Sequence, residues 1–354
     1  FRFVDSRANQ GVGVLPAGQQ VRVKVAGTPG ISADATAISA NFTIAEPAGA
    51  GFLTAYNCVG GPPAVSTLNY ERGQNASNQA IVPLDNGDLC LFSLSTAHIV
   101  IDVNGFVAPG GSQTFNPVSP KRLVDTRYTG LLSPGTPIVV PMTGGSSPVP
   151  GAATAVAINL TAVDGQADGW IRAYPCDQPE TTTSSVSGRY GRAIANSVIV
   201  PLAADGTICL ASMTTTNAVI DLTGWFGPSA GLNFVPVDPI RLADTRSFNA
   251  TLNPWGGGQM LAAGRVIEIR VAGTRGLPAD VTGATINLVA LGASSPGWLR
   301  AVPCDTSSEV SSINFSTPAP IANGTNVRLS SRGSVCVVGM STTHVIVDIT
   351  GVWK

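Results

Sequence analysis

The sequence RLVDTR at residues 122–127 occurs in two further versions, RFVDSR at residues 2–7 and RLADTR at residues 241–246. After each version the chain runs through an apolar segment containing Asn, two Cys and a closing D-x-x-G. The period of about 120 residues is far longer than a solenoid or propeller-blade repeat, so each copy is expected to be a whole domain. The predicted domains are residues 1–107, 113–227 and 232–354.

Short β-branched runs separated by Gly and Pro fill each copy, and helical periodicity is hard to find. The runs VRVKVAG at 21–27 and IEIRVAG at 267–273 alternate polar and apolar residues, as half-exposed strands do. The runs HIVIDVNGF at 98–106, NAVIDLTGWF at 217–226 and HVIVDITGVW at 344–353 are apolar on both faces, which indicates central strands covered on both sides. We therefore predict an all-β fold of three tandem β-sandwich domains of jelly-roll or Ig-like type.

The segments between copies are short, APGGSQ at 108–113 and GPSAG at 227–231, so a semi-rigid string of three domains is expected. The copies diverge in length at residues 253–259 and 290–297, which are candidate contact loops.

Six cysteines occur, two in each copy. The repeat favours one pairing among the possible ones, a bond inside each domain: Cys58–Cys90, Cys176–Cys209 and Cys304–Cys336. Such a bond stabilises a domain by roughly 3–4 kcal/mol in the chain-entropy model, and it indicates an oxidising compartment and hence a secreted, extracellular protein. Buried reduced thiols are the alternative. A metal site is disfavoured, because the chain has no C-x-x-C and only two His.

Charged residues make up 12% of the chain and the net charge is -1. A nucleic-acid-binding protein needs a basic surface, so nucleic acid is not an expected partner. No apolar run reaches the ~18 residues that a membrane helix requires, so no membrane span is expected.

Acidic and basic residues recur at fixed places in the three copies. Two carboxylates and a guanidinium could form a buried structural clasp in each domain, because the planar fork of Arg can bridge carboxylates. A carboxylate pair for glycoside hydrolysis is the alternative, disfavoured because a fold needs the set in every copy and an enzyme does not. The clasp residues are Asp5, Arg7, Asp102, Asp125, Arg127, Asp221, Asp244, Arg246 and Asp348.

An aromatic residue precedes the first Cys of each copy, at Phe52, Trp170 and Trp298, with Arg172 and Arg300 two residues after the tryptophans. These residues could stack a sugar ring or anchor an interface. A place in the core or at an interface is favoured over glycan contact.

Asn also recurs, at Asn41, Asn159 and Asn287 and again at Asn78, Asn196 and Asn323. An Asn at a strand entry usually satisfies local backbone groups, and ligand binding is the alternative. His98 and His344 share a position with Asn217, which argues against a general base or a metal ligand. No catalytic motif is found, so we expect no enzyme activity, no cofactor and no metal.

The chain resembles a secreted repeat domain of Gram-positive, chiefly actinobacterial, cell-surface proteins. The resemblance rests on RLVDTR, the NFT and NLT strands, the YPC cysteine, the AN…VIVPL strand and the closing VIVDITGVW, and it covers nearly the whole chain. Copy one departs with DSR for DTR, and copy three with NLV for NLT. The resemblance implies a cell-surface setting and no catalysis.

A lead-in segment precedes copies two and three, TFNPVSPK at 114–121 and NFVPVDPI at 233–240, but the sequence begins inside copy one. We therefore expect a processed or truncated form of something longer. An open edge in the first domain could be filled by a neighbouring chain, giving a head-to-tail filament.

The predicted function is a non-catalytic structural or adhesive protein that builds or decorates a bacterial surface assembly. Its expected partners are further copies of itself or other cell-surface proteins. An array of carbohydrate- or cell-wall-binding modules, with cell-wall glycans as partners, is the alternative.

Overall fold

The computed structural model describes residues 1–228, 231–248 and 258–354. Within these ranges the chain forms strands β1 to β24 and one 3₁₀ turn, η1 (Ser6–Ala8), so the all-β prediction is confirmed. The strands belong to six antiparallel sheets of four strands each, two from each repeat.

The strands of the three repeats correspond one to one. Repeat 1 contains β1 (Arg2–Asp5), β2 (Gln20–Lys24), β3 (Ala37–Ala45), β4 (Gly51–Tyr56), β5 (Leu68–Tyr70), β6 (Ala76–Pro83), β7 (Asp88–Ser93) and β8 (His98–Val107). Repeat 2 contains β9 (Thr114–Asp125), β10 (Ile138–Pro141), β11 (Ala155–Val163), β12 (Gly169–Pro175), β13 (Val186–Gly188), β14 (Ile194–Pro201), β15 (Thr207–Ser212) and β16 (Asn217–Gly227). Repeat 3 contains β17 (Phe234–Asp244), β18 (Val266–Arg270), β19 (Gly283–Leu291), β20 (Gly297–Pro303), β21 (Ile313–Phe315), β22 (Ile321–Arg328), β23 (Ser334–Gly339) and β24 (His344–Trp353).

Each repeat builds one large sheet and one small sheet. The large sheets have the strand orders β1-β8-β3-β6, β9-β16-β11-β14 and β17-β24-β19-β22. The small sheets have the orders β2-β7-β4-β5, β10-β15-β12-β13 and β18-β23-β20-β21. The strands that are apolar on both faces, β8, β16 and β24, each lie between two others in a large sheet.

The two sheets of a repeat face each other across a shared apolar core. In repeat 1 this core contains Phe42 and Ile44 from β3 of the large sheet and Leu53, Leu89 and Leu91 from the small sheet. Repeats 2 and 3 contain equivalent cores. Alternation along each strand explains the arrangement, because every second side chain points into the same face.

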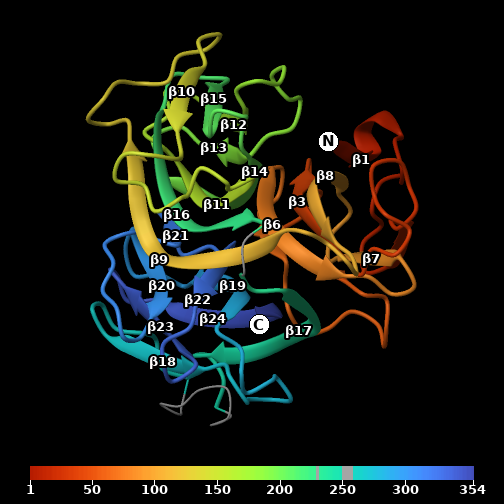
Figure 1. The fold of residues 1–354 in the computed structure, drawn as a ribbon. Coiled ribbons are helices and arrows are strands. Elements are labelled where there is room, and N and C mark those ends of the chain that lie inside the picture. Colours follow the sequence, from red (N-terminus) through yellow and green to blue (C-terminus); the bar gives the residue numbers. More distant parts are fainter. Residues whose placement is uncertain (229–230, 249–257) are drawn as a thin grey trace.

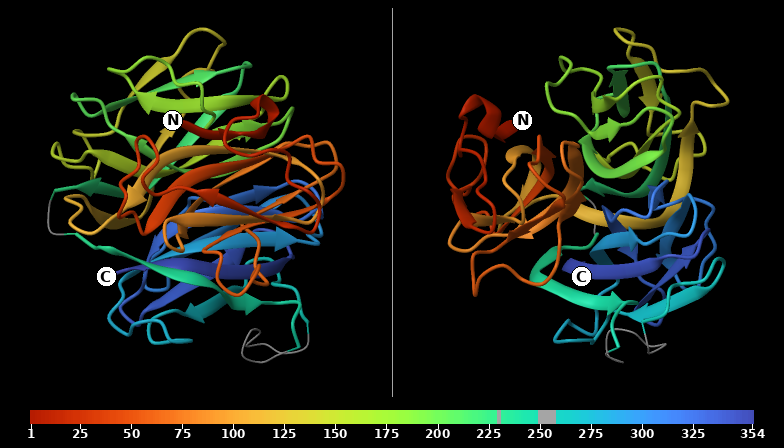
Figure 2. Two further views of the ribbon diagram at one scale, coloured as in Figure 1. Left: turned by 90° about the vertical axis from the view of Figure 1, so that its right-hand side faces the viewer. Right: turned by 180° about the vertical axis from the view of Figure 1, so that it is seen from behind.

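The three repeats lie around a common centre and not in a row (Figures 1 and 2). At this centre the large-sheet edge strands β6, β14 and β22 contact one another. The inner edge of each small sheet contacts a large sheet of another repeat: β5 contacts β22, β13 contacts β6 and β21 contacts β14. The six sheets therefore surround one axis like the blades of a six-bladed propeller, and each repeat supplies two adjacent blades.

The prediction of three tandem β-sandwich domains of jelly-roll or Ig-like type, arranged as a string, is therefore wrong. Strands β8, β16 and β24 are indeed covered on both faces, and their sequence shows this. What the sequence does not show is that the second cover comes from the neighbouring repeat. That cover joins the copies into one closed body, in place of the semi-rigid string that the short linkers suggested.

The three predicted disulfides are confirmed. Cys58–Cys90, Cys176–Cys209 and Cys304–Cys336 have Cα–Cα distances of 4.9, 5.0 and 4.9 Å. Each bond ties the end of one small-sheet strand to the adjacent strand, as Cys58 after β4 is tied to Cys90 in β7. Disulfides of this kind fit an oxidising compartment.

Two further sequence predictions concern the loops and the membrane. Of the divergent loop 253–259, residues 253–257 lie outside the described residues. The second loop, 290–297, joins β19 to β20. In the described ranges no helix has the length and apolar character that crossing a bilayer requires.

Candidate functional site

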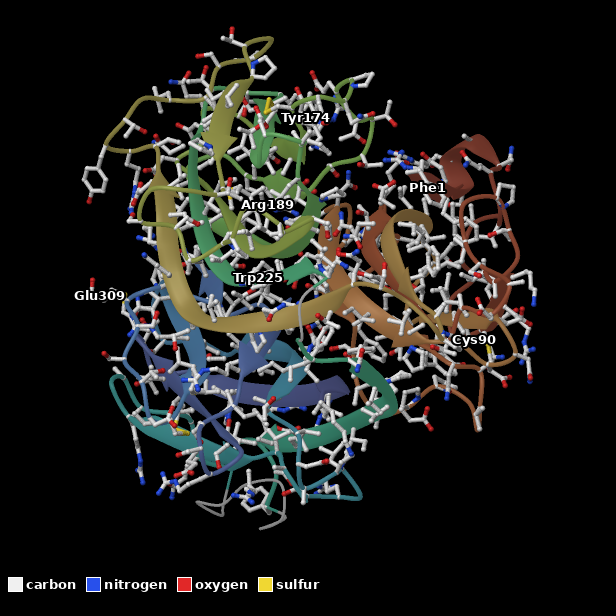
Figure 3. All side chains as sticks on the ribbon, in the orientation of Figure 1. Phe1, Cys90, Tyr174, Arg189, Trp225 and Glu309 are labelled. Atoms are coloured by element: carbon white, nitrogen blue, oxygen red, sulfur yellow. A yellow bond between two sulfur atoms is a disulfide. The ribbon has the colours of Figure 1, made fainter. Side chains whose placement is uncertain are left out.

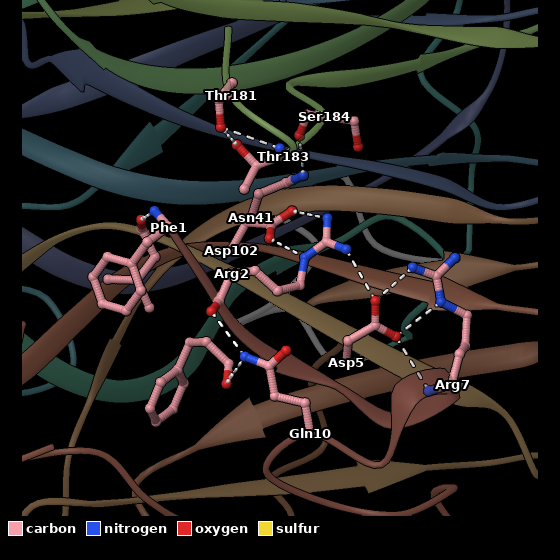
Figure 4. A network of polar contacts seen from close by, with 12 residues as sticks. Phe1, Arg2, Asp5, Arg7, Gln10, Asn41, Asp102, Thr181, Thr183 and Ser184 are labelled. Carbon is pink, nitrogen blue, oxygen red and sulfur yellow. Dashed lines mark hydrogen bonds and ion pairs between the residues drawn. The ribbon is translucent and has the colours of Figure 1, made fainter. Parts of the chain in front are cut away.

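The recurring charged residues of repeat 1 form a connected network on the large sheet (Figure 4). Arg2 donates from Nε to Asp102 Oδ1 at 2.6 Å and from Nη2 to Asp102 Oδ2 at 3.2 Å, while its Nη1 donates to Asp5 Oδ2 at 2.9 Å. Arg7 holds the same Asp5 carboxylate from the other side, from Nε at 2.9 Å and from Nη2 at 2.7 Å. The guanidinium that bridges both carboxylates is therefore that of Arg2, in β1.

The same network occurs in the other two repeats. Arg122 Nε donates to Asp221 at 2.9 Å and Arg241 Nε donates to Asp348 at 2.8 Å. Around them Arg127 pairs with Asp125, and Arg246 pairs with Asp244. Sequence reasoning placed these carboxylates correctly beside a guanidinium but chose the second Arg of each motif as the bridge. The strand register would have identified the bridging arginine, because Arg2 lies directly opposite Asp102 in the pairing of β1 with β8.

The pKa values of the two carboxylates in a clasp shift in opposite directions. Hydrogen bonds from Arg7 lower the pKa of Asp5 from 3.8 to about 2. Burial raises the pKa of Asp102 and of Asp221, against the hydrogen bonds from their arginines. In repeat 3 burial raises the pKa of Asp348 to about 6, although Arg241 opposes the shift.

The clasp bonds connect the first strand of each repeat, β1, β9 or β17, to its last strand, β8, β16 or β24.

The two sets of Asn form a second network, at the centre of the molecule. Asn196 donates from Nδ2 to Asn41 Oδ1, Asn323 to Asn159 and Asn78 to Asn287, each at 2.9 Å. Every one of these bonds joins two different repeats. The six side chains are at most 6% exposed.

The remaining atoms of these amides bond to backbone groups, again largely across repeats. The Oδ1 atoms of Asn196, Asn323 and Asn78 accept from the backbone N of Gln79, Ser197 and Gly324 at 3.0, 2.9 and 2.7 Å. The Nδ2 atoms of Asn41, Asn159 and Asn287 donate to the backbone O of Ser184, Ser311 and Ser66. The expectation that these Asn satisfy mainly local backbone groups is therefore incomplete.

A glycine shows how closely the repeats approach at this centre. A Cβ added at Gly324 in β22 would lie 2.3 Å from the backbone O of Gln79 in β6. Any side chain there would force the two central strands apart, so the glycine is needed for the ring to close.

The recurring aromatic residues lie on the small sheets, on the face opposite the core of their own repeat. Arg172 lies over the ring of Trp170, with Cζ 3.6 Å from the centroid, and also pairs with Glu180 at 2.6 Å. Arg300 lies 4.6 Å from the Trp298 centroid. In repeat 1, where no Arg follows, Phe52 packs instead against Phe92, with centroids 6.0 Å apart.

One of these aromatic positions faces the clasp of another repeat. A groove of about 500 Å³ between repeats 1 and 2 is lined by Arg2, Arg7 and Asp102 on one side and by Trp170 and Arg172 on the other. Arg189, which Figure 3 labels in the lobe of repeat 2, donates to the backbone O of Asn75 in repeat 1 at 2.7 Å. We call this space the 1–2 groove.

Each histidine bonds a hydroxyl group of its own repeat. His98 Nδ1 lies 3.0 Å from Ser6 Oγ and His344 Nδ1 lies 3.0 Å from Thr245 Oγ1, while Asn217 at the same position accepts from Thr126 Oγ1 at 3.2 Å. In each repeat this polar residue therefore bonds the hydroxyl of the residue that follows the recurring Asp of the R-x-x-D motif. Among the described residues, no group of three or more His, Cys, Asp or Glu could hold a metal ion.

Comparison with known proteins identifies no family. No protein-family model matches the chain, and no curated protein does. Among solved structures, the chain is similar to one from "Life in the extremes: atomic structure of Sulfolobus Turreted Icosahedral Virus", at 10% identity over 96% of this chain and 84% of that chain, with a TM-score of 0.20. A likeness at that score carries no weight for the fold or the function.

Proposed function

We propose that this chain is a non-catalytic structural or adhesive protein of a bacterial surface assembly. The observation that carries the proposal is that the recurring polar residues form hydrogen bonds to other groups of the protein itself. The clasp carboxylates accept from guanidinium groups of their own repeat, and the six central Asn bond repeat to repeat. Residues repeated in this way serve the rigidity of the body, which is what a building or anchoring unit requires.

The disulfides support the same proposal. They favour an exported protein, because disulfides persist in oxidising environments. Such cross-links also stabilise the folded unit by restricting the unfolded chain.

Electron microscopy of native surface material tests this proposal. The expected result is a regular array or fibre that an antibody against the chain labels along its length. The proposal fails if the chain is released as a free monomer and the surface structures carry no label. A matched preparation from cells lacking the chain controls for non-specific labelling.

The 1–2 groove favours a second candidate function, the binding of a surface glycan. It places the half-buried ring of Trp170 beside the polar groups of Arg172, Asp168 and Arg189. Carbohydrates are commonly bound by an aromatic face together with charged and amide groups that satisfy the hydroxyls. These lining groups support an extracellular glycan as the ligand class of this groove.

A pull-down on purified peptidoglycan and a glycan array test the second candidate. Saturable binding that Trp170→Ala removes would support it. Tyr128→Ala is the matched control, because Tyr128 is an exposed aromatic residue that does not line the groove. Binding that survives Trp170→Ala, or no binding at all, would exclude the groove as a glycan site.

A further inference from the structure

The 1–2 groove contains two buried polar atoms that have no hydrogen-bond partner in the described part of the chain. They are Oγ1 of Thr43, in β3 of repeat 1, and Nε of Arg172, in β12 of repeat 2. Both residues line the groove. Because buried polar groups are nearly always hydrogen-bonded, two unpaired ones on opposite walls of one groove indicate that a ligand supplies their partners.

The equivalent arginine of repeat 3 has the partner that Arg172 lacks. Arg300 donates from Nε to the backbone O of Val310 at 3.0 Å. Arg172 lies closer to its tryptophan, with Cζ 3.6 Å from the Trp170 centroid, and its Nη1 pairs with Glu180 at 2.6 Å. The Nε of Arg172 is therefore left for an acceptor from outside the chain, and a charged oxygen is the strongest acceptor for a guanidinium.

The wall of the groove in repeat 1 differs from the same surface of repeat 3. Thr43 and Ala45 correspond to Val289 and Leu291 by their places in β3 and β19. In repeat 3 these two side chains belong to an apolar cluster with Ile346. In repeat 1 a hydroxyl and a smaller side chain take their places, which makes this wall more polar and leaves room beside it.

Arg189 brings a positive charge to the groove that the other repeats lack at this position. It follows β13, and the residues at the same place after β5 and β21 are Glu71 and Ser316. Its guanidinium donates to the backbone O of Asn75, and within the described ranges it forms no ion pair with a carboxylate.

The surroundings of Arg189 leave its charge incompletely compensated. Burial lowers the pKa of Arg189, and the charge of Arg192 lowers it further, while Asp168 opposes the shift. An anionic group bound at this guanidinium would stabilise its charged form.

The other charged groups of the groove are already paired. Arg2 donates to both oxygens of Asp102, and Arg7 donates to Asp5. One oxygen of Asp168 accepts from a backbone N–H at 2.8 Å. The groove therefore offers a ligand mainly N–H donors, and the matching groups of the ligand are oxygen acceptors.

The groove lies at the other end of β8 from the segment that precedes the R-x-x-D motif. In repeat 2 the residues before Arg122 pair along Leu222–Gly227 of β16. The corresponding residues of repeat 1 are 103–108, whereas Val100 lines the groove. A segment of the same chain paired with residues 103–108 would therefore run away from Val100.

We propose that the 1–2 groove binds a saccharide that carries an anionic group, either a carboxylate or a phosphate. The sugar ring lies against Trp170, the anionic oxygens accept from Arg189 and from Nε of Arg172, and a sugar hydroxyl bonds Thr43. The groove volume of about 500 Å³ is in the range of small-ligand sites. The inference rests on the second candidate function, glycan binding, for which it names the ligand class.

Isothermal titration calorimetry of the full chain with matched disaccharides tests the inference. The probes are cellobiose and lactose, together with the forms of each that carry a carboxylate or a phosphate at C6 of the non-reducing sugar. At least one anionic probe should bind about tenfold more tightly than its neutral counterpart, because charge-assisted hydrogen bonds are the stronger ones. The carboxylate and phosphate arms show which anion is recognised.

The outcomes separate the inference from the function on which it rests. Neutral probes that bind as tightly as the anionic ones would overturn the inference and keep glycan binding as a function. No binding of any probe at millimolar concentration would reject both.

Substitution of Arg189 locates the anion. Arg189→Ala should bring the affinity for the anionic probe down to that for the neutral one, whereas Arg189→Lys keeps the charge and should retain part of the preference. Arg332→Ala is the matched control, because Arg332 is 69% exposed and does not line the groove. A preference that survives Arg189→Ala would contradict the inference.

Thr43→Val provides a second test that leaves the contact of Arg189 with repeat 1 intact. The fold accommodates valine at this place, since repeat 3 has Val289 there. Loss of the hydroxyl should weaken binding of the anionic probe severalfold. Full affinity in this variant would contradict the placement of the ligand against Thr43.

Discussion

Asn196 donates its side-chain amide to Oδ1 of Asn41 at 2.9 Å, although the two residues lie 155 positions apart in the chain. Two equivalent bonds, from Asn323 to Asn159 and from Asn78 to Asn287, complete the cycle. Each repeat therefore donates one bond of this kind and accepts one, and no repeat is terminal. This cyclic pattern explains why the chain closes into a single body.

Substitution of one Asn of the centre is expected to weaken the whole ring. Asn196→Ala removes the partners of Asn41 Oδ1, of the backbone N of Gln79 and of the backbone O of Ser185. Each buried group left without a partner costs about 1–3 kcal/mol, so the free energy of unfolding should fall by several kcal/mol. Urea unfolding measures the change.

Asn69→Ala is the control for this substitution. The Asn69 amide makes one long bond within its own repeat, 3.4 Å to Ser66 Oγ, so its loss should change stability by less than about 1 kcal/mol. Equal losses of unfolding free energy in the two variants would show that the bonds between repeats stabilise the protein no more than a bond within one repeat.

Removal of a bridging arginine should leave a buried charge unpaired. Arg241 is the bidentate partner of Asp348, whose side chain is 1% exposed. Arg241→Ala is therefore expected to destabilise the protein by about 3–5 kcal/mol. Arg332→Ala is the comparison, because Arg332 is 69% exposed in its pair with Glu268 and should matter by less than about 1 kcal/mol. A thermal midpoint that is equally unaffected in both variants would refute the structural role of the clasp.

The stability that Asp5 provides should depend on pH in the acid range. Its pKa is about 2 in the folded protein, below the ordinary value of 3.8, because hydrogen bonds from Arg7 favour the carboxylate. A lowered folded pKa means that the contribution is present above the unfolded pKa and is lost as the pH falls through the folded pKa. The difference in unfolding free energy between the unaltered chain and Asp5→Asn should therefore shrink as the pH falls from 5 to 2.

Glu71→Gln, a change at an exposed residue, serves as the reference for this titration. Its effect on stability should stay small across the same range. If the Asp5→Asn difference were constant from pH 5 to 2, the carboxylate of Asp5 would not be held by its arginines in solution.

Loss of any one disulfide should lower the free energy of unfolding by a similar amount in each repeat. The loops closed by the three bonds differ by one residue at most, with separations of 32, 33 and 32. The chain-entropy model then gives about 3–4 kcal/mol for each bond. Paired Cys→Ser substitutions, made one bond at a time and measured by calorimetry, check this value. A destabilisation confined to one of the three would contradict it.

The sequence predicts the local features of the fold better than the global ones. The disulfide pairs follow from the repeat, and the strand nature of segments such as 98–106 follows from their β-branched residues. The glycan-or-interface reading of Trp170 stays a prediction, since the structure shows only that the ring lines the 1–2 groove.

The closed arrangement could not be predicted in the same way. An Asn inside an apolar strand, such as Asn159, needs a buried hydrogen-bond partner. The residues next to it in the sequence do not indicate that this partner is Asn323, which lies 164 positions away. The identity of the bridging arginine likewise depends on register, because the bulge in β1 between Arg2 and Val4 sets which side chain faces Asp102. Alternation counted along the sequence alone cannot include such a bulge.

Small-angle X-ray scattering of the full chain tests the central claim, the closure of the three repeats into one ring, most directly. A compact body of 354 residues should have a radius of gyration of about 20 Å. Three domains of this size arranged in a row would give a value on the order of 30 Å. The ring predicts the smaller value in dilute solution and a single-peaked distance distribution, and a value near 30 Å would contradict it.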